Sequence, residues 1–238
     1  MSADFNIPVV VSSVNDALFI ATGKCGTSTL WDLPGNNSDF CDTVNIMSEI
    51  NRRLAMKPVD KMFITIREPR QRFLSGLFEE VGERMVRPIL QSMHLKDHEY
   101  ESIITQQQFW TDNIQNYFFQ FGSCLPNRQA TSTYAYHAGN WLHLVGYLLS
   151  AYPQLQVVEL DQFGALLSSL NLPPLNINQS ADKFIWVSNN IRDRELIKLF
   201  EKAYLAVEPE FLQQIDTYLE HEIQLYAGIQ QLNRHWHV

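Results

Sequence analysis

Hydrophobic runs and helical stripes alternate along the chain in an order that predicts an α/β protein. The apolar run at residues 17–22 (ALFIAT) ends at Gly23 and indicates a buried strand, a glycine-containing loop and the start of a helix. The run at residues 62–66 (MFITI) indicates a second buried strand, and Pro69 stands in the first turn of a following helix, where proline is favoured. Two buried strands that are each followed by a helix are typical of a parallel sheet.

The rest of the chain has a mainly helical pattern. A third buried strand is expected at residues 157–160, and Asp161 after it is a good N-cap for a helix through residue 170. Apolar residues at helical spacing predict further helices at residues 46–54, 73–81, 84–121, 141–152, 196–207 and 211–226. Helices are expected to end at or be separated by Pro58, Pro153 and Pro209. The segments predicted as loops are residues 36–42 and 171–180.

The composition restricts the class of protein. Of the 238 residues, 45% are hydrophobic and 18% are charged, which excludes a disordered or collagen-like chain and suffices for one sizeable core. We see no interdomain linker, so a single domain over residues 1–238 is expected. No run approaches the length of a transmembrane helix, and the first ten residues lack the pattern of a secretory signal. Three cysteines at unrelated spacings fit neither a disulfide framework nor a zinc site, so we expect a reduced, cytoplasmic protein without a metal.

Charge is distributed unevenly along the chain. The net charge of −8 argues against a general nucleic-acid binder. Nine of the 18 basic residues nevertheless lie between Arg52 and Arg87, together with only five acidic ones, so this window carries +4. A local positive field on an acidic protein suits a small polyanionic ligand, although a solvated basic face is the alternative.

The first motif with chemical meaning is the turn at residues 23–29 (GKCGTST), between a predicted strand and a predicted helix. Such a turn presents backbone N–H groups and a helix N-terminus to an anion, with a lysine and hydroxyl groups beside them. It is not a Walker A loop, because Lys24 precedes Gly26 instead of following the second glycine. An ordinary strand–helix connection remains the alternative.

The second motif is residues 67–75 (REPRQRFLS). Arg67 is expected at the carboxyl end of a strand, where open α/β sheets bind ligands. At about 100° per residue, Arg72, Ser75 and Glu79 share one face of the following helix, which we expect to line a cleft. The opposite face is apolar and carries Leu74, Leu77, Phe78 and Val81. Arginines at a helix N-terminus oppose the helix macrodipole, which favours an anionic partner over a solvated helix start.

Together the two motifs resemble those of sulfotransferases that use 3′-phosphoadenylyl sulfate (PAPS). Residues 24–30 (KCGTSTL) look like the loop that binds the 5′-phosphosulfate in that family. Residues 67–76 (REPRQRFLSG) look like its 3′-phosphate motif, in which an arginine at a strand end and a serine eight residues later hold the phosphate. Within the family, the sequence of this second motif is most similar to that of the carbohydrate sulfotransferases. Weaker similarity continues through residues 139–160 and 178–204.

The resemblance implies a three-layer P-loop-like α/β fold, with a central parallel sheet flanked by helices. It also implies sulfuryl transfer from PAPS to a hydroxyl or amine of an acceptor, a carbohydrate or small alcohol, with adenosine 3′,5′-bisphosphate as the other product. Lys24 would stabilise the charge that develops on the departing phosphate. The rest of the cradle would be Cys25, Gly26, Thr27, Ser28 and Thr29. Arg67 and Ser75 would hold the 3′-phosphate, the arginine through two parallel hydrogen bonds.

A base must also take the proton of the acceptor, and members of the family use histidine or glutamate. Residues 30–61 contain no histidine, although some relatives carry theirs between the two motifs. Glu79 is our candidate because it lies one helical turn beyond Ser75; a surface glutamate is the alternative. The weaker candidates are His94, His98, His137 and His143, the last of which suits a packing role. The aromatic residues Trp110, Tyr117, Phe118 and Phe119 could line an acceptor pocket, but core packing is the simpler explanation.

Two other functions stay open at this point. A kinase-like phosphotransferase of related fold would lack the Walker lysine and a clear magnesium carboxylate. A member of the family that binds a nucleotide or a sulfated glycan without catalysis would explain the missing histidine. The expected partners are PAPS and an acceptor, with no nucleic acid and no membrane span, and the sequence does not indicate an oligomeric state.

Overall fold

The structure, a computed structural model, describes residues 8–23, 25–26, 29–30, 33, 37–42, 45–94, 96–121, 141–173 and 193–232. These residues fall into two compact units, which we describe separately. The first unit lies within Met1–Arg72, Ala135–Ile177 and His221–Val238, and the second within Phe73–Tyr134 and Asn178–Glu220. The division does not test the expectation of a single domain, which stays a prediction.

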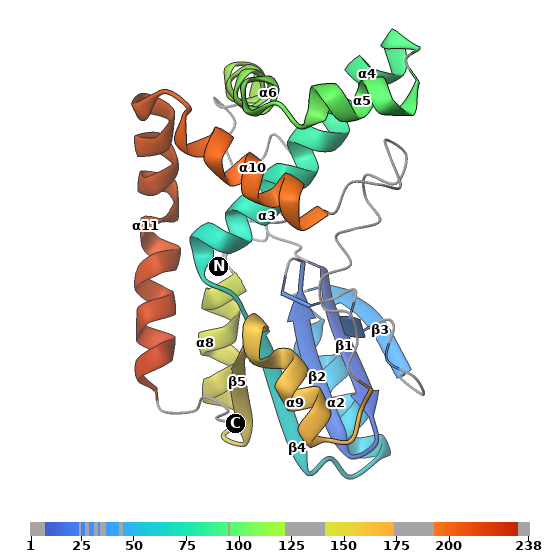
Figure 1. Ribbon diagram of the computed structural model, residues 1–238. Coiled ribbons are helices and arrows are strands. Elements are labelled where there is room, and N and C mark those ends of the chain that lie inside the picture. The colour runs from blue at the N-terminus through green and yellow to red at the C-terminus, as the bar shows by residue number, and fades with distance from the viewer. Residues whose placement is uncertain are drawn as a thin grey trace. The chain divides into compact units, whose positions relative to one another are not determined.

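The first unit is built on a five-stranded sheet with the order β3-β1-β2-β4-β5 (Figure 1). The strands are β1 (Pro8–Val14), β2 (Ala17–Thr22), β3 (Asn37–Asp42), β4 (Lys61–Ile66) and β5 (Leu155–Glu159). β2, β4 and β5 run parallel, whereas β1 is antiparallel to both of its neighbours. The α/β class is confirmed. The expectation of a parallel sheet is right for three strands and wrong for β1 and β3, so the sheet is mixed.

The two strands that the sequence pattern did not predict lie together. β1 joins β2 through a two-residue turn, in which Asn15 has φ of +53°, a conformation that asparagine tolerates. β3 is an edge strand that pairs with β1, and the prediction of a loop at residues 36–42 is wrong. Its sequence, NSDFCD, is rich in residues that strands disfavour, so pairing with β1 decides its conformation and local propensity does not.

Helices pack on both faces of the sheet. One face carries α2 (Ile46–Met56), α8 (Trp141–Ala151) and the end of α11 (Pro209–Gln231), with Ile229 buried there. The other face carries α9 (Phe163–Ser169). β2 shows the division, because Leu18 and Ile20 point to the first core and Phe19 points to the second. The expectation of a central sheet flanked by helices is confirmed.

The second unit is helical. It contains most of α3 (Pro69–Val81), a π-helical turn at Gly82–Val86, α4 (Arg87–Met93), α5 (Asp97–Ile104), α6 (Gln107–Phe121) and α10 (Asp193–Leu205). Its core includes Phe78, Trp110 and Phe200, whose ring centroids lie 5.1 to 5.5 Å apart. Tyr117 and Phe118 are also buried, so core packing accounts for three of the four aromatic residues that were candidates for an acceptor pocket. Phe119, the fourth, is 85% exposed.

Several helix boundaries differ from the sequence expectations. α3 begins at Pro69 as predicted, and α2 ends just before Pro58. Asp161 is not the N-cap of α9, because it lies inside a 3₁₀ turn at Leu160–Gln162 that precedes the helix. Pro209 is the first residue of α11 and not a separator before it, which agrees with the preference of proline for a first helical turn.

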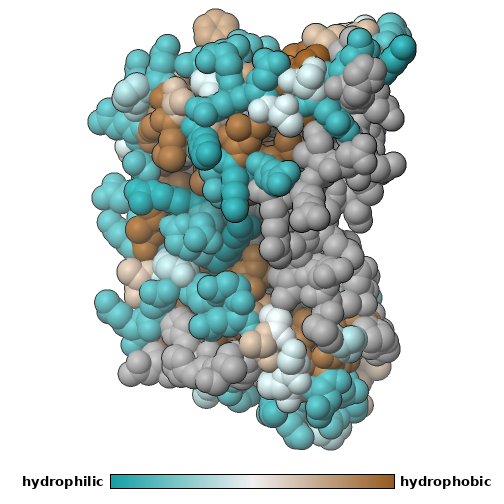
Figure 2. Space-filling view, viewed as in Figure 1, coloured by the Kyte–Doolittle hydropathy of each residue, from teal (hydrophilic) through white to brown (hydrophobic). Residues whose placement is uncertain are grey.

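The surface carries large hydrophobic side chains at separate places. Among the described residues these are Met56, Met93, Phe119, Tyr147, Leu205 and Leu232. Figure 2 shows hydrophilic residues interspersed with smaller groups of hydrophobic ones on the viewed face. None of the described helices is long and apolar enough to cross a membrane.

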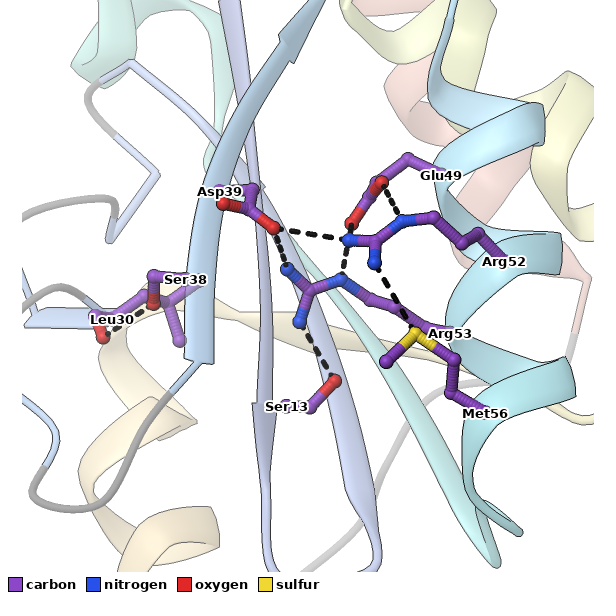
Figure 3. Close-up of polar contacts among 8 residues, drawn as sticks. All are labelled: Ser13, Leu30, Ser38, Asp39, Glu49, Arg52, Arg53 and Met56. Carbon is purple, nitrogen blue, oxygen red and sulfur yellow. Dashed lines mark hydrogen bonds and ion pairs between the residues drawn. The ribbon is translucent and has the colours of Figure 1, made fainter.

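A polar network joins β1, β3 and α2 (Figure 3). The guanidinium of Arg53, only 4% exposed, donates to Ser13 Oγ and Asp39 Oδ2 at 2.8 Å each and to Glu49 Oε1 at 2.5 Å. Arg52 pairs with the same two carboxylates from the exposed side. Hydrogen bonds from Arg52, and then from Arg53, lower the pKa of Glu49. The stability that this carboxylate contributes is therefore lost as the pH falls below its usual pKa.

The two adjacent arginines give a test of this network. Arg53→Ala should lower the free energy of unfolding by about 3 kcal/mol, because it leaves Glu49 and Asp39 without the buried cation between them. Arg52→Ala should have a clearly smaller effect, because the Arg52 side chain is exposed to water. Urea unfolding followed by circular dichroism measures both. Equal losses in the two variants would contradict the assignment of Arg53 as the central residue.

Candidate functional site

The carboxyl ends of the three parallel strands meet at one edge of the sheet. Ile66 of β4 pairs in register with Glu159 of β5, and β2 runs alongside β4 in the same direction. The turn after β2, Arg67 after β4 and the residues after β5 therefore leave the sheet at the same edge, where open α/β sheets bind ligands. The expectation that Arg67 directly follows a buried strand is confirmed.

The described part of the first motif is a tight turn. The N–H of Cys25 donates to the carbonyl of Thr22 at 3.0 Å, and Gly26 has φ of +100°, a conformation that favours glycine. The N–H of Leu30 donates to the carbonyl of Gly26 at 3.1 Å, and Thr29 has helical conformation. A strand, a glycine turn and a helical start thus follow each other as predicted. Three predicted site residues lie outside the described residues, namely Lys24, Thr27 and Ser28.

Contacts on two sides hold this turn against other residues of the first unit. The hydroxyl of Thr65, near the end of β4, donates to the carbonyl of Cys25, and the indole N–H of Trp141 donates to the Thr65 carbonyl at 3.2 Å. On the other side, a Cβ on Gly26 would lie 3.3 Å from a methyl of Leu160. Sequence reasoning did not identify Thr65. The sequence feature that could have indicated Thr65 is a hydroxyl side chain inside the otherwise apolar run MFITI.

The pKa of the Cys25 thiol depends on its burial and on the charged residues around the turn. Burial raises the pKa of its thiol to about 11, while the charges of Arg72 and Arg67 lower it and those of Glu159 and Glu222 raise it. The thiol is therefore protonated at neutral pH and is not a nucleophile. Cys25 of the first motif follows β2, and Arg67 of the second follows β4, the parallel neighbour of β2 in the sheet.

Arg72 does not lie on an open polar face. It is 3% exposed, and Glu222 of α11 in the same unit is 6% exposed. Ser75 and Glu79 lie on α3 within the second unit, and both are half-buried. The structure thus corrects the view that Arg72 lines a cleft together with these two residues. The roles of Ser75 and Glu79 stay predictions.

Glu159 links α11 to the end of β5. Its Oε1 accepts hydrogen bonds from the hydroxyl of Tyr226 at 2.7 Å and from the side-chain amide of Gln230 at 3.1 Å. Burial, followed by this carboxylate, raises the pKa of Tyr226 well above its usual range. Neither Glu159 nor Tyr226 was singled out from the sequence, because their partners lie about 70 residues apart along the chain.

Most basic residues between Arg52 and Arg87 form ion pairs within the protein. Arg52 and Arg53 pair with Asp39 and Glu49, and Lys57 pairs with Asp16, so acidic residues from outside the window neutralise its first part. The last part forms the pairs Arg84–Glu80 and Arg87–Glu83. The local positive field expected from the sequence is therefore reduced at both ends of the window.

The other candidate bases are placed as follows. His94 ends α4 in a left-handed conformation and is exposed, and His143 is exposed on α8 beside His221. His137 lies outside the described residues, and only the backbone of His98 is described. No group of three or more His, Cys, Asp or Glu side chains in the described part of the chain could hold a metal ion.

Comparison with known proteins gives no relative. No family model matches the chain, and neither a curated protein nor a solved structure has significant similarity to it. The likeness to the PAPS-dependent sulfotransferases therefore depends on the two motifs and on the surroundings of their residues.

Two glycines provide a matched test of the turn. Gly26→Ala should lower the free energy of unfolding by about 1–3 kcal/mol, because an alanine at φ of +100° is strained and its methyl would press on Leu160. Gly146→Ala on α8 should instead raise it by about 0.5–1 kcal/mol, because the added methyl meets open space and alanine favours a helix. Thermal or urea unfolding measures both changes. A Gly26→Ala protein as stable as the wild type would show that the turn is not constrained as described.

Proposed function

We propose that the protein is a sulfotransferase with a P-loop-like fold that takes its sulfuryl group from PAPS. One observation carries the proposal. The motifs at residues 23–29 and 67–75 both follow strands that end at the same carboxyl edge of the sheet. The glycine turn follows β2 and Arg67 follows β4, and these two parallel strands are neighbours in the sheet. One nucleotide that carries two anionic groups, a 5′-phosphosulfate and a 3′-phosphate, could contact both motifs at once.

In this proposal the turn holds the phosphosulfate. The amide of Cys25 is already bonded to Thr22, so the anion receives its hydrogen bonds from the amides and hydroxyls between Gly26 and Thr29. Lys24 approaches the oxygen that bridges sulfur and phosphorus. As the S–O bond breaks, the electron pair stays on that oxygen, and the lysine ammonium stabilises the charge.

The second motif gives the choice of nucleotide. Arg67 binds the 3′-phosphate as a bidentate donor, and Ser75 adds a hydroxyl. Arg70 is exposed in the first turn of the same helix. It adds positive charge there, and the proposal gives it no contact with the nucleotide. A nucleotide without a 3′-phosphate loses these interactions and should bind weakly.

Glu79 is the proposed base. It takes the proton of the acceptor hydroxyl or amine while the acceptor oxygen or nitrogen forms its bond to sulfur. Glu80, the next residue, is buried and paired with Arg84 at 2.6 Å, so it is engaged in the fold of the second unit. His94, His98 and His137 are the residues to test if Glu79 is not the base.

A binding experiment distinguishes the proposal from its alternatives. Isothermal titration should show that adenosine 3′,5′-bisphosphate binds much more tightly than AMP without a divalent metal. Arg67→Ala should remove about 10- to 150-fold of that preference, the equivalent of about 1.5–3 kcal/mol for a charge-assisted contact. Arg70→Ala is the matched control and should leave most of the preference intact.

Three other results would favour a different function. Equal binding of the two nucleotides would overturn the assignment. Tight, magnesium-dependent binding of ATP would favour a kinase-like phosphotransferase. Selective binding of adenosine 3′,5′-bisphosphate with no transfer of radiolabelled sulfate to any of a broad panel of carbohydrates and alcohols would favour a non-catalytic member.

Turnover tests the two proposed catalytic residues. Glu79→Gln keeps the shape but removes the basicity, so kcat should fall about 100-fold or more while nucleotide affinity stays unchanged. Lys24→Ala should lower kcat more than it weakens nucleotide binding, because its interaction strengthens in the transition state. Glu83→Gln, an exposed residue paired with Arg87, is the control and should be nearly as active as the wild type. Normal turnover in folded Glu79→Gln protein would remove Glu79 from the mechanism.

A further inference from the structure

Two histidines from distant parts of the chain face each other on the first unit. His143 lies on α8 and His221 on α11, and their ring centroids are 6.1 Å apart with an angle of 32° between the ring planes. Both side chains are exposed. Among the described residues neither ring has a hydrogen bond or an ion pair, so the structure gives them no other polar role.

From this arrangement we propose that His143 and His221 together bind a divalent transition-metal ion, such as Zn²⁺, between α8 and α11. A ring nitrogen lies about 1 Å from its ring centroid and a Zn–N bond is about 2.0–2.1 Å, so two imidazoles on one tetrahedral ion have centroids about 5 Å apart. The observed separation is about 1 Å longer, and rotations of the two exposed side chains would bring one nitrogen of each ring to the ion.

The chemistry of the site restricts the ion. Neutral imidazole suits Zn²⁺, Ni²⁺ and Cu²⁺, whereas Mg²⁺ and Ca²⁺ prefer oxygen ligands. The described residues hold no group of three ligands, so water would complete the coordination shell. Binding should therefore be reversible, and it should weaken in acid, because both rings must be unprotonated.

A bound ion would stabilise the C-terminal helix. α11 supplies Tyr226 and Gln230 to Glu159, and its Glu222 is one of the charges that act on Cys25. A metal bridge between His221 and α8 would hold the part of α11 that belongs to the first unit, from His221 onward, against α8. This proposal does not depend on the proposed function.

The experiment is a titration of the full chain with ZnCl₂, followed by thermal unfolding and isothermal calorimetry. Zn²⁺ should raise the Tm of the wild type, and Mg²⁺ should not. His143→Ala and His221→Ala should each weaken Zn²⁺ binding about tenfold or more, because the second ligand no longer acts at high effective concentration. Both residues are exposed, so the Tm without metal should stay close to that of the wild type.

Two control variants test whether other histidines bind the ion. His94→Asn replaces an exposed histidine in the second unit and suits the positive φ there. A double variant, His235→Ala with His237→Ala, removes the two histidines near the end of the sequence. Both controls should bind Zn²⁺ as the wild type does. Wild-type affinity in His143→Ala or His221→Ala, or loss of binding in either control alone, would overturn the proposal.

Discussion

The hydrogen bond from Thr65 to the carbonyl of Cys25 is the interaction on which the candidate site depends. Cys25 in the turn after β2 is fully buried, so its backbone carbonyl must find a partner inside the protein. Thr65 supplies one partner from the neighbouring parallel strand, and Trp141 in turn donates to the Thr65 carbonyl. The position of the turn is therefore set by β4 and α8, and the same strand β4 places Arg67 at its end.

Buried charge is the second constraint on the first unit. Arg53 and Arg72 are both almost fully buried, although arginine is rarely buried without charged or polar partners. Arg53 joins two strands to α2 through Asp39, Glu49 and Ser13. These pairs show why a count of charges within one window overstates the positive field: Glu49 pairs with Arg53 from just outside the window, and Asp39 reaches it only through the fold.

The two halves of the proposed site differ in what supports them. Cys25 and Arg67, both on the nucleotide side, lie in the first unit. Ser75, the second proposed ligand of the 3′-phosphate, and Glu79, on the acceptor side, belong to the second unit, whose core includes Phe78, Trp110 and Phe200. Binding and turnover of variants therefore address different parts of the proposal.

The sequence by itself determined the buried parallel strands β2, β4 and β5, the helices with clear apolar stripes and the place of Arg67, because each depends on local periodicity and on proline and glycine. Only the tertiary structure decided the rest. β3 has almost no strand propensity and exists because β1 offers it hydrogen bonds. Thr65, Glu159 and the pair His143–His221 acquire their roles from partners far away in the chain, and no local pattern encodes contacts at such separations.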